Sequence, residues 1–113
     1  MHVLDKINAF RKEHGVSPLQ NWNGAENDHC YRHSLHMACR GEVCHAPARF
    51  LLHRLEAVSS YPYVGTLWDT LDKTLRLHFE PESAKLNVVL LPHLAYGLYK
   101  HYHIVYITVR GWN

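Results

Sequence analysis

The chain has 113 residues, the length of one domain, and we expect a single domain spanning residues 1–113. Hydrophobic residues make up 47 % of it and charged residues 19 %, a balance that argues against a disordered or low-complexity protein. Twelve Lys and Arg against ten Asp and Glu leave a net charge of +2, too small for a protein that holds nucleic acid by charge alone. The sequence has no apolar run of about 18 residues, so no membrane span is predicted.

The first two predicted helices cover residues 3–14 and about 23–40. In the first, apolar residues recur every three or four positions, which is the spacing of one buried helix face, and Gly15 ends it. In the second, a broad apolar arc lies beside a narrow arc of histidines, and Gly41 is the stop signal.

Two further helices are predicted over 48–58 and 66–79. Pro47 suits the first turn of the third helix, and a loop follows it over 59–65. Pro81 ends the fourth, which places its leucines along one side.

The C-terminal part changes character. Four apolar residues, 88–91, precede Pro92. The segments 94–99 and 104–109 are rich in β-branched and aromatic residues, and residues 100–103 are their expected hairpin connection. Helices first and strands last predict an α+β domain, a compact α-β-α sandwich of about four helices around a three-stranded antiparallel sheet.

Three cysteines are present, so at least one thiol is free or pairs between chains. Cys30 and Cys39 fall on one predicted helix, about 13.5 Å apart along its axis, too far for a disulfide. A bridge from Cys44 to either of them stays open. The N-terminal sequence carries no apolar signal stretch.

A pattern of residues in the first half resembles the CAP superfamily, the SCP-like domain of cysteine-rich secretory, antigen-5 and pathogenesis-related proteins, and its bacterial branch in particular. The pattern comprises Asn8, Arg11, Gly15, Pro18, Leu19, Trp22, His33, Ser34, Met37, Ala38, His45, Arg54 and Leu55. In the second half, Asn87 and Gly97 match. The resemblance implies an α-β-α sandwich and a structural role for His33.

The resemblance also implies a cavity in which two histidines and one or two glutamates hold a divalent metal. His45 matches the first histidine. Thr66 stands where the glutamate of the Gly-Glu-Asn motif is expected, and Ala84 where the second histidine is expected. The metal tetrad is therefore predicted to be largely lost, and no cofactor is expected.

Zinc is the alternative, bound by His45 with some of His36, Cys39, Cys44 and Glu80, because thiolates and imidazoles at a helix end can ligate it. The pairs within His29, His33 and His36 are spaced for a shared ion, although a structural role for His33 and a solvated face for the other two fit better.

The sequence offers no nucleophile motif and no identifiable pair of catalytic carboxylates, so a non-catalytic function is favoured over an enzyme. Alternating C-terminal tyrosines fit sheet packing better than a binding face. Eleven histidines leave open a pH-responsive interaction protein. We therefore expect a histidine-rich binding or interaction module for an unknown protein, lipid or surface ligand. The resemblance implies an extracellular or cell-surface location, and a cytoplasmic one stays open.

Overall fold

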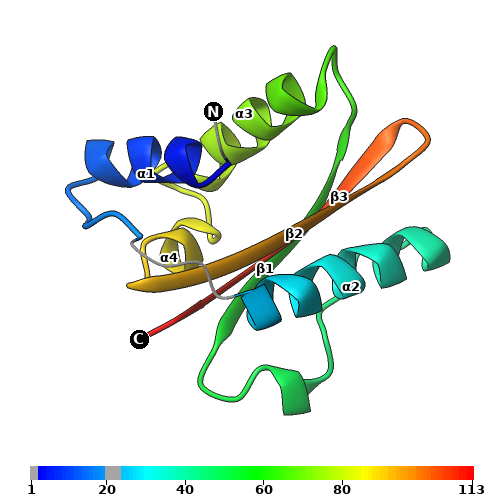
Figure 1. Ribbon diagram of the computed structural model, residues 1–113, viewed down its shortest axis with the longest axis horizontal. Coiled ribbons are helices and arrows are strands. Elements are labelled where there is room, and N and C mark those ends of the chain that lie inside the picture. The colour runs from blue at the N-terminus through cyan, green and yellow to red at the C-terminus, as the bar shows by residue number, and fades with distance from the viewer. Residues whose placement is uncertain (1–2, 20–23) are drawn as a thin grey trace.

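The computed structural model describes residues 3–19 and 24–113 and shows a three-stranded antiparallel sheet between two layers of helices (Figure 1). The elements in chain order are α1 (Val3–Glu13), α2 (Gly24–Arg40), a 3-10 turn η1 (Ala48–Phe50), β1 (Leu55–Pro62), α3 (Leu67–His78), α4 (Leu86–Val89), β2 (His93–His101) and β3 (Ile104–Trp112). Helix α2 lies alone on one face of the sheet, and α1, α3 and α4 lie on the other. The predicted α-β-α sandwich is confirmed.

Three of the four predicted helices are confirmed. Helix α1 ends ahead of Gly15, whose φ of +69° lies in the left-handed region that favours glycine. Helix α3 begins at a capping box, in which the Thr66 hydroxyl accepts from the backbone of Asp69 and the Asp69 carboxylate accepts in return. Thr66 therefore acts as the N-cap residue of α3. The predicted contribution of Trp22 to the first connection falls outside the described residues.

The predicted helix over 48–58 is wrong. Only the turn after Pro47 is helical, and His53, at φ +58°, turns the chain into strand β1. Most of the predicted loop over 59–65 is strand as well. The apolar residues of this stretch fit helical spacing and strand alternation equally well, and pairing with β3 decides between them. Strand β1 therefore precedes α3, so the predicted order of helices first and strands last is wrong.

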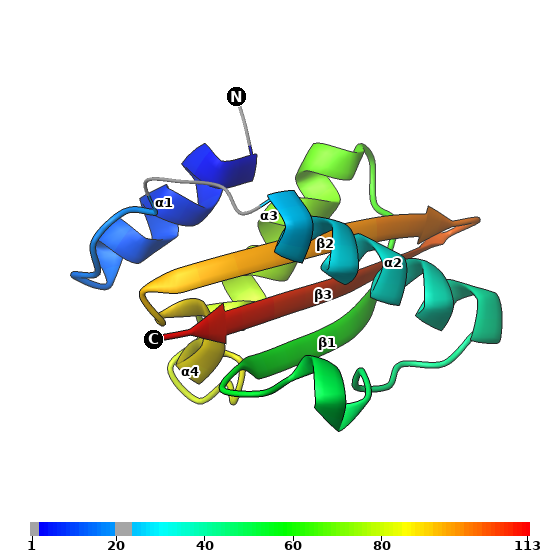
Figure 2. The same cartoon turned by 60° about the horizontal axis from the view of Figure 1, so that its bottom comes forward.

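Strand β3 is the centre of the sheet, with the order β1-β3-β2 (Figure 2). It pairs antiparallel with both neighbours, in registers that set Leu55 against Gly111 and His93 against Trp112. Nearly all of β3 is buried, as its apolar sequence on both faces predicts. The β2–β3 connection is shorter than expected, because the strands extend to His101 and from Ile104. Residues 86–89, just before Pro92, form the short helix α4.

The layer of α1, α3 and α4 holds the apolar core. Its buried members are Ile7, Leu19, Ala57, Leu71, Leu75, Phe79, Val88, Val89, Leu94, Val105, Ile107 and Val109. Buried Arg11 ties this layer together: Nη1 donates to Val89 O at 2.8 Å and to Leu91 O at 2.7 Å, and Nε to Ser17 O. Burial lowers the pKa of Arg11, but the guanidinium stays charged and donates through both Nε and Nη1.

Helix α2 approaches the sheet more closely and through polar contacts. A Cβ on Gly97 would lie 2.0 Å from Tyr31 N, so only glycine permits this approach. Ser34 Oγ donates to Gly97 O at 2.8 Å, and its oxygen lies 2.9 Å from the Thr108 hydroxyl, which is left to donate to it. Asn27 Oδ1 accepts from the backbone of Tyr96. These bonds fix the position of α2 along the sheet and thereby of the side chains on its outer face.

Candidate functional site

His45, the first candidate, lies in the chain that connects α2 to η1 and contacts Glu56 of β1. Its Nδ1 is 3.0 Å from Glu56 Oε1, and the same oxygen accepts from Ala46 N at 2.9 Å. The imidazole side chain is 64 % exposed, whereas the carboxylate of Glu56 is 1 % exposed. A buried carboxylate therefore holds an exposed histidine at the surface.

Glu56 also holds a buried arginine. Arg110 of β3 donates through Nε to Glu56 Oε2 at 2.8 Å, and its Nη1 is 3.7 Å from Glu26 Oε1 on α2. Glu26 in turn pairs with Arg54 at 2.9 Å. The Arg110 side chain is 2 % exposed, and Nη1 has no hydrogen-bond acceptor in the described chain. Two carboxylates and two guanidiniums thus form one nearly neutral network beneath α2.

The residues matched to the rest of the metal tetrad do not join His45. Thr66 caps α3 and Ala84 lies between α3 and α4, both in the layer on the opposite face of the sheet from α2. Glu56, on strand β1 after the turn η1, is the carboxylate that contacts His45. The match of Thr66 to the glutamate of the family motif stays a prediction, and in the structure Thr66 caps α3.

The alternative zinc ligands are also spread out. Cys39 is exposed on α2, Cys44 is half-buried in the following segment, and Glu80 is exposed past the end of α3. All three cysteines are free thiols, so neither open disulfide is formed. Within residues 3–19 and 24–113, no three His, Cys, Asp or Glu side chains gather closely enough to hold a metal ion.

The histidine arc of α2 divides as expected. His33 is buried, and its Nε2 donates to Cys44 O at 2.6 Å, which ties α2 to the segment that carries His45. His29 and His36 are exposed on either side of it, and the His36 ring stacks on His33 at 6.0 Å between centroids. The structural role implied for His33 agrees with this hydrogen bond.

The arc forms one wall of a groove, which we call the α2 groove. It has a volume of about 440 Å³ and is lined by His29, Arg32, His33, His36, Ala46, Pro47, Phe50 and Arg110. Helix α2 supplies one wall, residues 46–50 the other, and Arg110 comes from the sheet between them. Phe50 is 45 % exposed, and its ring is met edge-on by His29 at 6.4 Å. The α2 groove joins positive groups to an apolar wall.

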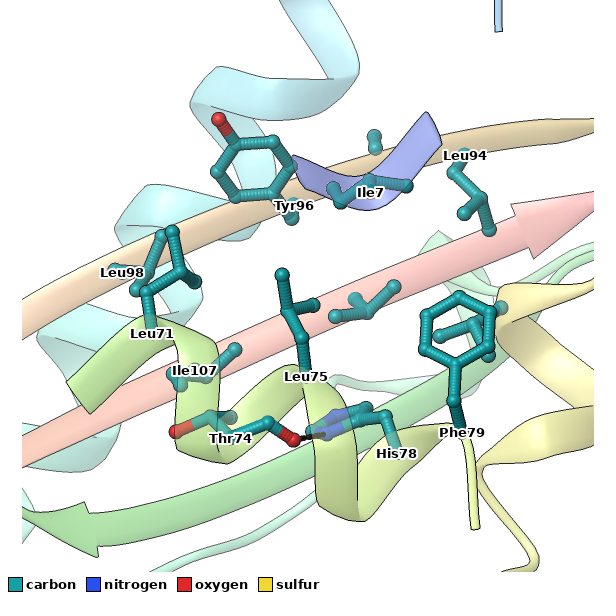
Figure 3. Close-up of a pocket in the computed structure, with 13 residues that line it drawn as sticks. Ile7, Leu71, Thr74, Leu75, His78, Phe79, Leu94, Tyr96, Leu98 and Ile107 are labelled. Atoms are coloured by element: carbon teal, nitrogen blue, oxygen red, sulfur yellow. Dashed lines mark hydrogen bonds between the residues drawn. The ribbon is translucent and has the colours of Figure 1, made fainter. Parts of the chain in front are cut away.

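A second, smaller cavity lies inside the apolar layer (Figure 3). Its volume is about 20 Å³, room for one water at most, and Leu71, Leu75 and Phe79 are among its lining residues. His78 lines it too: Nδ1 donates to Thr74 O at 2.9 Å, while Nε2 is buried without a hydrogen bond. Burial lowers the pKa of His78 to about 4. The cavity is too small for a ligand, and His78 is a neutral core residue.

Glu26, Glu56 and Arg110 were not identified from the sequence as members of one network. Glu56 fell inside the wrongly predicted helix over 48–58, and Arg110 lies one residue beyond the predicted strand 104–109 but inside β3. An arginine inside an otherwise apolar strand was the available signal, because a buried charge needs a partner.

No protein-family model matches the chain, and no curated protein matches its sequence. Among the helices that the structure describes, none has the length and apolar character needed to cross a bilayer.

Proposed function

We propose that this protein is a small binding module with a CAP-like fold, without catalytic activity, whose ligand occupies the α2 groove. The groove itself carries this proposal. Its volume of about 440 Å³ falls in the range of small-molecule sites, and it combines an exposed aromatic wall with a few polar groups.

The supporting walls of the groove are rigidly placed. The hydrogen bond from His33 to Cys44 ties α2 to the segment that leads into the second wall, and the bond from Ala46 to Glu56 fixes the second wall to the sheet. A preformed groove loses little conformational entropy when a ligand binds. Two of the residues that carry the CAP resemblance, Ser34 and Gly97, hold α2 on the sheet and so support the scaffold on which the groove is built.

The decayed metal site is part of the proposal. Both oxygens of Glu56 are engaged by protein groups, through Ala46 and His45 on one side and Arg110 on the other. The carboxylate therefore acts as an anchor for Arg110 and for the groove wall.

A fragment panel tests the proposal. Amide-resolved NMR spectra of the intact protein are recorded with neutral, cationic and anionic aromatic fragments. We expect at least one class to shift the amides of 29–36 and 46–50 saturably. If no class perturbs these residues, the α2 groove is not a binding site and the proposal fails.

The second candidate function is that of a zinc protein, favoured by one observation, the contact of His45 with Glu56. Metal analysis of protein purified without a metal-affinity column separates the two, together with melting in the presence and absence of a chelator. We expect no zinc and an unchanged melting temperature. Stoichiometric zinc, with a chelator-dependent loss of stability that His45→Ala abolishes, would favour the second candidate.

The partner class and the location of the protein are proposed from the resemblance alone. We propose a protein, lipid or surface ligand as the physiological partner class and an extracellular or cell-surface location. Secretion of a tagged full-length protein from its source cells, against retention in the cell lysate, tests the location.

A further inference from the structure

Three hollows lined by described residues differ in charge. The cavity beside His78 is apolar and holds one water at most. A surface hollow of about 340 Å³ between α1 and α3 mixes Asp5, Glu13 and Asp72 with Lys6 and Arg76, so it favours neither sign of charge. In the α2 groove, none of the described lining residues is a carboxylate.

We propose that the α2 groove binds an organic anion, a carboxylate or phosphate ester carried on an aromatic or apolar body. This inference rests on the proposed function and names the ligand class of the same site. The anionic group meets Arg32 and the edge of Arg110, and the apolar body lies on Phe50 and Pro47.

Arg32, the cation at the rim of the α2 groove, can leave its present ion pair with only a small loss of free energy. Arg32 pairs with Asp28 one turn earlier at 2.9 Å, but the two side chains are 74 % and 53 % exposed. Exposed pairs at this spacing contribute only about 0.3–0.5 kcal/mol. A ligand anion in the groove can therefore replace Asp28 as the partner of Arg32 without a large loss, and the guanidinium fork matches two oxygens of a carboxylate or phosphate.

The floor of the groove holds a charge that is fixed in place. Arg110 lines the groove and is 2 % exposed, and its Nε is bound to Glu56. Its Nη1 is 3.7 Å from Glu26 Oε1, beyond hydrogen-bond length, and no other described group accepts from it. A buried guanidinium with an unused donor is unusual, since buried polar groups are normally satisfied. An anion in the groove lies next to this incompletely used cation.

The second wall explains why an inorganic anion alone is a poor match. Ala46, Pro47 and Phe50 present no charged group to the groove, and exposed Phe50 offers a flat face or edge to an apolar partner. The Arg49 guanidinium lies 4.7 Å from the centre of the Phe50 ring and adds positive charge behind this wall. Burial of an apolar body supplies the affinity that a solvated phosphate lacks.

The chain contains a matched pair of variants for the test. Arg32 pairs with Asp28 and Arg76 with Asp72, both at i,i+4 and both at 2.9 Å, with side chains 74 % and 68 % exposed. Arg32→Gln removes a positive charge from the α2 groove, and Arg76→Gln removes the same charge from helix α3 on the opposite layer. Circular dichroism confirms that both variants keep the fold.

The probe is phenyl phosphate, with benzoate, inorganic phosphate and phenol as comparison arms, titrated into the full chain and followed by NMR at the amides of 29–36 and 46–50 and at the Nε–H of Arg110. We expect phenyl phosphate or benzoate to bind more tightly than phenol and inorganic phosphate. We expect Arg32→Gln to weaken that binding about tenfold, the loss of one charge-assisted hydrogen bond, and Arg76→Gln to leave it unchanged.

Each other result counts against the inference. If phenol binds as tightly as phenyl phosphate, or if Arg32→Gln and Arg76→Gln behave alike, the groove does not select anions, although it remains a binding site. If inorganic phosphate binds as tightly as phenyl phosphate, the apolar wall has no role. If a cationic or neutral fragment shifts the groove and the anions do not, the ligand class is wrong. A groove that responds to none of the fragments removes the proposed function itself.

Discussion

The two faces of the sheet are built from different chemistry. The face under α1, α3 and α4 carries the larger apolar core, with a small cavity among its described residues. The face under α2 combines a smaller apolar cluster of Met37, Ala38 and Tyr106 with a hydroxyl pair, a buried ion network and a glycine contact. The first face supplies stability through burial, and the second holds a helix at a defined place through directional bonds. A groove lies beside the second face, where α2, the sheet and the chain after α2 meet.

The largest expected effect breaks the close approach of α2. Gly97→Ala places a Cβ 2.0 Å from Tyr31 N, a backbone atom that cannot move alone, so α2 must shift as a unit. We expect the free energy of unfolding to fall by about 4 kcal/mol or more, measured by urea denaturation. Gly24→Ala is the control, because nothing lies within 4 Å of its Cβ position. Equal stabilities of the two variants would show that α2 does not pack as described.

The next prediction removes one charge from the network. Glu56→Gln leaves Arg110 buried without its nearest counter-ion, and removal of one partner from a buried pair costs about 3–5 kcal/mol. Glu82→Gln, an exposed carboxylate past the end of α3, serves as the control in the same denaturation experiment. Solvent-exposed ion pairs contribute about 1 kcal/mol or less, so a loss of stability below about 1 kcal/mol would show that water reaches the network.

A pH titration of stability tests the buried histidine on the apolar face of the sheet. His78 has a folded-state pKa of about 4 against 6.5 when unfolded, so below pH 6.5 the unfolded chain binds the extra proton. Stability is therefore fully present above pH 6.5 and falls as the pH drops toward 4, by up to about 3 kcal/mol. His78→Met removes this part of the pH dependence, whereas His101→Gln, on an exposed side chain, leaves it in place. Identical pH profiles for the His78→Met and wild-type proteins would contradict a buried neutral imidazole.

The smallest effect is a difference in thiol reactivity that reports opening of α2. Burial raises the pKa of Cys30 to about 12, whereas Cys39 is exposed on the same helix. We expect a disulfide reagent to label Cys39 rapidly and Cys30 only after unfolding, because the thiolate is the reactive form. Cys39→Ser should remove the fast phase. Fast labelling of Cys30 in the native protein would show that α2 lifts from the sheet.

Local patterns were sufficient for α1, α2 and α3. Each has an apolar repeat of helical period and a clear end, such as Gly15 or the Thr66 cap. Residues 48–58 lacked such a decisive pattern, because Phe50, Leu51, Leu55 and Val58 also suit a turn followed by a strand. Whether the segment forms a helix or a strand depends on its pairing with residues more than forty positions later in the chain. Such pairing is a property of the assembled sheet and has no local signal.

The same limit applies to the site. His45 was identified as a candidate, and the resemblance matched Thr66 to its glutamate partner, whereas in the structure Glu56 of β1 contacts His45. The network of Glu26, Glu56 and Arg110 joins a helix to two strands that are distant in sequence. Once β1 replaces the predicted helix over 48–58, Glu56 and Arg110 become facing partners in register.

The central claim is that ligands bind on the polar face, in the α2 groove. A crystal structure of the full chain grown with phenyl phosphate tests it most directly. We predict density for the phosphate group beside Arg32 and Arg110 and for the ring beside Phe50. Density confined to the hollow between α1 and α3, with the α2 groove holding only solvent at saturating phenyl phosphate, would contradict it.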